Sequence, residues 1–235
     1  MIKNDLFDYP NRYIYQLPDA FKFSLDSILL AEFVKISPTK EMTILDMCTG
    51  NAPIPLILST KTSSPIIGFE LQKEIYDLAI KSVELNNLTQ QITIYNEDIN
   101  NLKMVFPGKY FDIITCNPPY FPTTESSNVN KSTFQKIARH ELTITLRDIF
   151  YLVKNHLKEN GVFYLVHRPN RLDEIILYAN ECKMKVKEVQ LITTKNNIPS
   201  LVLVKIVKHG QKGIKFAGII NINEYKTYQN IFKEE

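Results

Sequence analysis

The chain has 235 residues, of which 44% are hydrophobic and 23% are charged. This composition is ordinary for a globular protein and excludes a largely disordered chain, and the length allows one domain or two small ones with a sizeable core. The 28 basic and 25 acidic side chains leave a formal net charge of +3. A charge this small does not by itself identify a nucleic-acid-binding protein.

The three cysteines, Cys48, Cys116 and Cys182, are far apart, and no CxxC or Cys/His spacing accompanies them. We therefore expect neither a disulfide framework nor a zinc site. The first 13 residues include Lys3, Asp5, Asp8 and Arg12 and contain no apolar signal core. No apolar run approaches the roughly 20 residues that span a bilayer. These patterns predict a cytoplasmic protein with reduced thiols and no membrane or metal partner.

From residue 42 onward, short apolar runs alternate with segments of helical spacing. The runs predicted to be strands are residues 42–47, 66–70, 92–96, 111–116 and 161–167. The segments predicted to be helices are residues 53–59, 72–86, 146–157 and 171–182. This alternation indicates an α/β fold in which helices cover both faces of a parallel sheet.

Three further segments lie outside this alternation. Residues 185–193 and 200–207 are β-rich runs joined by a short polar segment, which predicts an antiparallel pair. Residues 121–145 form a long polar insert after the fourth strand. His156 and His209 belong to no group of chemically related residues, and we expect both at the surface.

Ligands of parallel sheets bind at the carboxyl ends of the strands, near the switch in strand order. The first strand ends in the turn from Asp46 to Ala52, where Gly50 supplies the backbone freedom that lets N–H groups approach a ligand. Asp46 is suited to hold a cationic or amine group. Taken alone, this turn is equally compatible with an ordinary connection from strand to helix.

Acidic residues also follow the second and third strands. Glu70 stands where nucleoside-binding sheets grip the hydroxyl groups of a ribose, and a carboxylate accepts two hydrogen bonds from such a diol. Asp98 is suited to accept from an adenine amino group, with Ile99 against the ring. Glu70 is also compatible with a solvated strand end, and the Asp98 segment with a simple turn.

The strongest signal is the run Asn117-Pro118-Pro119-Tyr120 after the fourth strand. The two prolines fix a rigid loop. The Asn117 amide oxygen and the Pro118 carbonyl can accept hydrogen bonds from one planar NH₂ group, and the Tyr120 ring offers a face for stacking. Two acceptors favour electron density on that nitrogen and place it to attack an electrophilic methyl group.

This run resembles motif IV of amino-group methyltransferases that use S-adenosylmethionine. The turn 46–52, Glu70 and Asp98 match motifs I to III, and residues 23–31 resemble the motif X region. Residues 138–141 and 167–169 extend the likeness to the bacterial tRNA1(Val) (adenine-37-N6)-methyltransferase family. The resemblance covers residues 19 to about 207.

The resemblance implies a Rossmann-like class I fold with a mostly parallel seven-stranded sheet and an antiparallel C-terminal strand pair. It implies an N-terminal arm, residues 1–40, that packs on the cofactor site, and a catalytic domain over residues 41–235 with its insert at about 121–145. The implied activity is methyl transfer from S-adenosylmethionine to N6 of an adenine in tRNA. The implied target is A37 in the anticodon loop of valine tRNA.

The resemblance also assigns roles, residue by residue. The implied catalytic residues are Asn117, Pro118 and Tyr120. The implied cofactor-binding residues are Leu25, Asp26, Asp46, Cys48, Thr49, Gly50, Glu70, Asp98, Ile99 and Asn117. The implied substrate-binding residues are Pro119, Tyr120, Phe121, Arg139, His140 and Arg168. Arg139 and His140 are also compatible with a solvated helix start.

Basic side chains near the cleft are expected to hold the RNA backbone. These are Lys131, Lys136, Arg139, Arg168, Arg171, Lys205, Lys208, Lys212 and Lys215.

Cys48 and Ala52 occupy positions where motif I usually has glycine. An RNA-binding module without catalysis is therefore kept as an alternative function. A protein glutamine N5-methyltransferase and an rRNA guanine-N2-methyltransferase are kept as well, because such enzymes use similar NPP loops. A nicotinamide-dependent dehydrogenase is disfavoured because the turn has no GxGxxG pattern.

Overall fold

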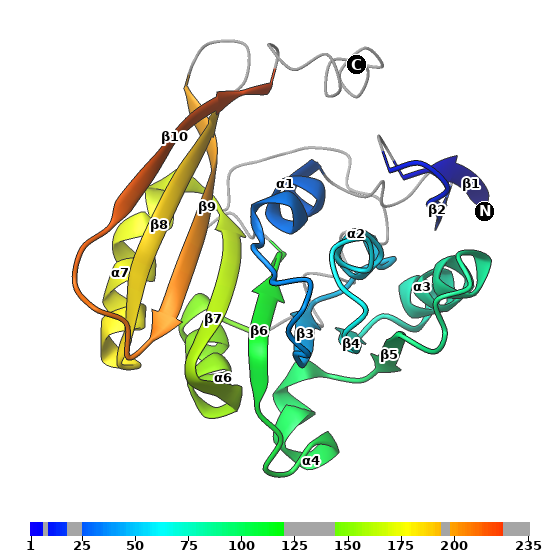
Figure 1. The fold of residues 1–235 in the computed structure, drawn as a ribbon, viewed down its shortest axis with the longest axis horizontal. Helices are drawn as coiled ribbons and strands as arrows, with labels where there is room; N and C mark the ends of the chain where they lie inside the picture. Colours follow the sequence, from blue (N-terminus) through cyan, green and yellow to red (C-terminus); the bar gives the residue numbers. More distant parts are fainter. Residues whose placement is uncertain (7–8, 18–24, 120–143, 194–197, 223–235) are drawn as a thin grey trace, which may run out of the picture.

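The structure is a computed structural model and describes residues 1–6, 9–17, 25–119, 144–193 and 198–222. A sheet with the strand order β10-β8-β9-β7-β6-β3-β4-β5 runs through these residues (Figure 1). Its strands are β3 (Ile44–Met47), β4 (Ile66–Glu70), β5 (Ile92–Asn96), β6 (Phe111–Cys116), β7 (Leu157–His167), β8 (Met184–Thr193), β9 (Pro199–Lys208) and β10 (Lys215–Asn221).

The sheet confirms the predicted class. Strands β3 to β7 are parallel, and β9 runs antiparallel to both β7 and β8. The seven predicted strands are joined by an eighth, β10, which pairs with β8 in parallel. Strand β10 was not among the predicted strands. Its side chains are mostly exposed, so it shows no run of buried residues.

Helices cover both faces of the sheet (Figure 1). One face packs against α1 (Leu25–Phe33), α2 (Pro53–Leu58) and α3 (Lys73–Leu85). The other packs against α4 (Leu102–Val105), α6 (Leu146–His156) and α7 (Leu172–Glu181). Short 3-10 helices, η1 (Ile99–Asn101) and η2 (Pro169–Arg171), precede α4 and α7. Two apolar clusters result, and each buried strand contributes to both.

Strand β3 shows why the sequence predicted this arrangement. All four of its residues are buried. Ile44 packs into the cluster beneath α1 and α2, whereas Leu45 packs into the cluster beneath α6. Successive side chains of a strand point to opposite faces, so a continuous apolar run indicates a strand covered on both sides.

The N-terminal arm contains an antiparallel hairpin that the sequence analysis missed, formed by β1 (Ile2–Asp5) and β2 (Tyr13–Gln16). Its second strand lies on α3. The backbone N–H of Tyr13 donates to Asn86 Oδ1 at 2.9 Å, and that of Tyr15 donates to Ser82 Oγ at 2.9 Å. Side chains of a helix thus satisfy the outer edge of a strand too short to give a clear sequence pattern.

The two histidines that were predicted to lie at the surface differ in exposure. His156 is only 4% exposed, and its Nδ1 lies 3.3 Å from the Lys109 carbonyl oxygen, so the prediction that it lies at the surface was wrong. His209 is exposed, as predicted.

Within the described ranges, no helix has the length and apolar character that a membrane crossing requires.

Candidate active site at the carboxyl ends of the central strands

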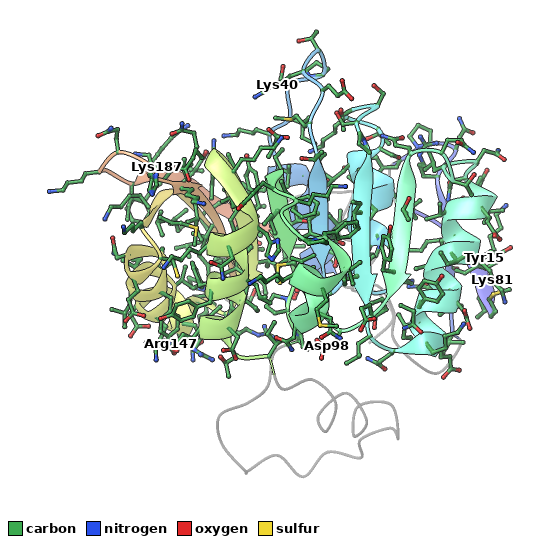
Figure 2. The ribbon with its side chains drawn as sticks, turned by 90° about the horizontal axis from the view of Figure 1, so that it is seen from below. Tyr15, Lys40, Lys81, Asp98, Arg147 and Lys187 are labelled. Atoms are coloured by element: carbon green, nitrogen blue, oxygen red, sulfur yellow. The ribbon has the colours of Figure 1, made fainter. Side chains whose placement is uncertain are left out.

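The strand order reverses at β3. From there the chain adds β4 and β5 on one side and β6 and β7 on the other. Asp46 of β3 is paired with Thr115 of β6, and Met47 with Cys116. The turn after β3 and the loop after β6 therefore leave the sheet side by side, at the switch point where such folds bind ligands. Figure 2 shows Asp98 at the carboxyl ends of the strands and Lys40 on the opposite side, at their amino ends.

The turn after β3 has an unusual backbone. Cys48, Gly50 and Ala52 have positive φ angles of 58°, 59° and 75°. This left-handed conformation costs non-glycine residues about 1–2 kcal/mol each, which explains why glycine is common at these positions. Thr49 holds the turn, since its N–H donates to the Phe69 carbonyl at 2.8 Å and its hydroxyl to the Asp46 carbonyl at 3.0 Å. The turn therefore forms with Cys48 and Ala52 in place.

Asp46 is fully buried beside this turn. Its Oδ1 accepts a hydrogen bond from the Thr115 hydroxyl at 2.6 Å. Its Oδ2 is also buried, and among the described residues nothing donates to it. Burial raises the pKa of Asp46 from 3.8 to about 7, although the neighbouring hydroxyl groups of Thr115 and Thr49 oppose this. A buried carboxylate oxygen without a donor is costly, and a bound ammonium group would satisfy it.

Glu70 ties the end of β4 to the turn. Its Oε2 accepts from the N–H of Gly50 at 2.9 Å, and its Oε1 accepts from the N–H of Gln72 at 2.8 Å. The side chain is only 7% exposed, and burial raises the pKa of Glu70 against the effect of these two donors and of the Leu71 N–H. The carboxylate is thus held in one orientation, and it retains acceptor capacity for a ligand hydroxyl.

Asp98 and Ile99 follow β5 at the same edge. Asp98 Oδ1 accepts from the backbone N–H and from the side-chain amide of Asn100, both at 2.9 Å, and so caps η1. Asp98 thus stabilises a turn, which the sequence allowed as an alternative to binding an adenine amino group. Ile99 is buried in the apolar cluster beneath α6.

The loop after β6 meets the first turn of α1. Asn117 is half-buried, Pro118 is buried and Pro119 is half-buried. Asn117 Nδ2 donates a hydrogen bond to Ser27 Oγ at 2.9 Å. Leu25 and Asp26, the predicted cofactor-binding residues of the arm, begin the same helix and are half-buried.

Sequence reasoning missed Ser27 and Thr115 as partners of site residues. Ser27 stood inside the motif X region and Thr115 lies in β6 beside Asp46, but neither residue type is informative alone. The predicted residues Tyr120, Phe121, Arg139 and His140 lie outside the described residues, as do Lys131 and Lys136.

Arg168 follows β7 at the edge of the sheet where the site lies and is exposed. Its Nη1 donates to the Ser200 carbonyl at 3.3 Å, and its N–H donates to His167 Nδ1 at 2.8 Å. Burial lowers the pKa of His167 to about 4, so this imidazole is neutral at pH 7 and able to accept that bond. Arg171, close by, forms an ion pair with Glu174.

Lys208 was predicted to contact the RNA backbone, and the structure places it elsewhere. Strand β9 runs antiparallel to β7, so its last residue lies at the amino end of the parallel strands, away from the site. The Lys208 ammonium donates to the carbonyl oxygens of Lys154 at 3.0 Å and Leu157 at 2.8 Å. Lys208 therefore stabilises the end of α6.

A family model described as a methyltransferase domain matches residues 38–231. A tRNA1(Val) (adenine(37)-N6)-methyltransferase of Cytophaga hutchinsonii is 24% identical over 189 residues, which cover 80% of this chain and 77% of the relative. The protein with the same description from Bacteroides thetaiotaomicron is 23% identical over 234 residues, covering 98% and 95%.

Solved structures show the same fold. A predicted O-methyltransferase from Agrobacterium tumefaciens superposes with a TM-score of 0.62 at 18% identity, covering 84% of this chain and 88% of the other. The 16S rRNA N2 G1207 methyltransferase of T. thermophilus, in complex with AdoMet and guanosine, superposes with a TM-score of 0.61 at 18% identity, covering 84% and 47%. The chain belongs to the methyltransferase domain family, with the class I fold of S-adenosylmethionine-dependent enzymes.

Proposed function

We propose that this protein transfers a methyl group from S-adenosylmethionine to N6 of an adenine in tRNA, in the cytoplasm, and that the target is nucleotide 37 of valine tRNA. The observation that carries the proposal is the position of Asn117 and Pro118 beside the turn after β3. The register of β3 and β6 brings these two segments together. Relatives that align with most of the chain have this activity in their names.

The residues at the turn fit the proposed cofactor. The unsatisfied, buried Oδ2 of Asp46 suits the ammonium group of its methionine part. The oriented carboxylate of Glu70 suits the hydroxyl groups of its ribose. Asp98 and Ile99 are assigned to its adenine, and Leu25 and Asp26 to closing the pocket from α1. Bound there, S-adenosylmethionine supplies an electrophilic methyl group on a positively charged sulfur.

The loop after β6 acts on the acceptor. The exocyclic NH₂ of adenine is a poor nucleophile because its lone pair is delocalised into the ring. The Asn117 amide oxygen and the Pro118 carbonyl accept its two hydrogens, which favours a pyramidal, electron-rich nitrogen and aligns it for direct transfer. The proton becomes acidic as the new bond forms and leaves to solvent, so neither a strong general base nor a metal ion is required.

The rest of the proposed site serves the RNA. A base within a loop has to leave its stack to enter the pocket, at some energetic cost. Tyr120 and Phe121 are assigned to stacking on that base, and Pro119 to shaping the loop. Arg139, His140 and Arg168 are assigned to the RNA backbone, so binding should weaken as salt is raised.

The test is the substitution Asn117→Ala. Incubation with labelled S-adenosylmethionine and total small RNA, followed by nucleoside mass spectrometry, should show N6-methyladenosine in valine tRNA for the wild type. In the variant we expect transfer to fall by about 10²–10³-fold, as when a transition-state hydrogen bond is removed. Calorimetry should show that the cofactor still binds. The matched control is Asn180→Ala, at the end of α7 away from the site, where the amide donates to the Ile176 carbonyl at 2.8 Å and accepts from the Lys185 ammonium.

Other results of the same assay would select an alternative function. Full activity of Asn117→Ala would refute the role given to the loop. N2-methylguanosine in rRNA or N5-methylglutamine in protein would replace adenine as the target. A wild-type protein that binds RNA but no cofactor would be a module without catalysis.

A further inference from the structure

Ser27 is the residue that holds the amide of Asn117. The two residues are 90 positions apart in the sequence, and Asn117 Nδ2 donates to Ser27 Oγ at 2.9 Å. Ser27 lies in the first turn of α1 and is 7% exposed, so the bond is largely shielded from water. Shielding raises the cost of breaking such a bond, because water does not replace the lost partner.

An asparagine side chain has a donor end and an acceptor end, and a rotation of 180° exchanges them. In the proposed reaction the acceptor end must face the adenine NH₂. If the amide turned over, two N–H groups would face each other and neither would have an acceptor. In the structure the Ser27 hydroxyl oxygen accepts from the donor end, Nδ2, and this arrangement leaves the acceptor end, Oδ1, for the substrate.

We propose that Ser27 is a positioning residue for methyl transfer: its hydroxyl oxygen accepts from Nδ2 and thereby directs Asn117 Oδ1 toward the amino group to be methylated. This inference rests on the proposed function and adds a residue to it. Ser27 touches neither the reacting nitrogen nor the methyl group in this role, and it acts only through Asn117.

The surroundings of Ser27 keep it in place. Ile28, Leu29 and Leu30 of α1 are buried in the cluster shared with α2. The far end of α1 is held by Lys61, whose ammonium donates to the carbonyl oxygens of Ala31 at 2.7 Å and Val34 at 3.1 Å. A cation at a helix C-terminus satisfies carbonyls that have no partner within the helix. Helix α1 thus presents the Ser27 hydroxyl to the loop from a fixed position.

The first experiment is the kinetics of Ser27→Ala. We expect kcat to fall about tenfold, as befits the loss of one oriented hydrogen bond, while KM for tRNA and for S-adenosylmethionine stays within about twofold. The matched control is Ser64→Ala. Ser64 is also buried and its hydroxyl accepts from the Met42 N–H at 3.0 Å, but it precedes β4, at the edge away from the site. This control should keep the wild-type kcat.

A double-mutant cycle separates positioning from a general structural role. If Ser27 acts through Asn117, then Ser27→Ala has no further effect on kcat in the Asn117→Ala background. If the two losses multiply, Ser27 acts on its own and the proposal is overturned. An unchanged kcat for Ser27→Ala would overturn it as well.

A measurement without turnover tests the contact itself. In the NMR spectrum, the two Asn117 Nδ2 protons, assigned by their absence in Asn117→Ala, should differ in exchange rate because one is bonded and shielded. Ser27→Ala should speed the exchange of the slower proton, and an unchanged rate in this variant would refute the contact. An unequal pair in a wild-type protein that methylates no adenine would instead count against the proposed function alone.

Discussion

At the scale of single residues, Asp46 shows most clearly that a group placed to bind a ligand can lower the stability of the free protein. Its carboxyl group is fully buried with one oxygen lacking a donor among the described residues, and its pKa is raised to about 7. Between the unfolded value near 4 and this folded value, the folded protein binds a proton that the unfolded chain does not. Asp46 therefore adds stability below about pH 4, and this contribution is lost as the pH rises through 7.

We expect Asp46→Asn to remove this pH dependence. Without cofactor, the free energy of unfolding of the wild type relative to the variant should fall by about 2–3 kcal/mol between pH 5 and pH 8. Denaturant unfolding at the two pH values measures the difference. A constant difference across this range would show that Asp46 is already ionised at pH 5. Saturating S-adenosylmethionine should reduce the pH dependence, because its ammonium group stabilises the charged carboxylate.

At the scale of elements, the turn after β3 depends on a strand that makes room for it. Gly68 in β4 is paired with Asp46 in β3. A Cβ atom added at Gly68 would lie 2.5 Å from Thr49 Oγ1 and 2.7 Å from Ile94 Cδ1. Thr49 also makes the hydrogen bonds that hold the turn, so the missing side chain of Gly68 links the packing of β4 to the shape of the proposed cofactor site.

Gly68→Ala should therefore lower both stability and cofactor affinity. Overpacking of this kind costs typically about 1–3 kcal/mol, and displacement of Thr49 should weaken S-adenosylmethionine binding in addition. Thermal unfolding and calorimetry measure the two effects. Gly210→Ala, near the amino ends of the parallel strands, serves as the control and should keep the wild-type cofactor affinity. Wild-type affinity in Gly68→Ala would show that the turn tolerates movement of Thr49.

At the scale of the whole molecule, the two ends of the parallel strands have different roles. The residues that follow β3, β4, β5, β6 and β7 meet at the carboxyl edge, where the proposed site lies. Strand β9 runs the other way, so the segment after Lys208 begins at the amino edge. Lys205 is paired with Tyr164 in the middle of β7, whereas Lys208 and Lys212 lie at or beyond the end of β9, on the side of the sheet away from Arg168.

We expect Arg168→Ala and Lys212→Ala to differ in RNA binding, although both side chains are exposed. Arg168→Ala should weaken tRNA binding and reduce the slope of log affinity against log salt by about 1, as for one lost phosphate contact. Lys212→Ala, beyond β9 at the amino edge, should change neither quantity. Titrations at several salt concentrations measure both. Equal effects of the two substitutions would place the RNA across both edges.

The sequence alone predicted the alternation of strands and helices, the positions of Glu70 and Asp98 after their strands, and the rigid loop that begins with Asn117. These features depend on periodicity and on neighbours in the chain, which a sequence displays directly. Only the tertiary structure revealed the contact of Ser27 with Asn117, the unsatisfied oxygen of Asp46, the pairing of β10 with β8 and the place of Lys208. Each of these depends on which distant segments pack together and exclude water, and that is decided by the long-range order of the sheet.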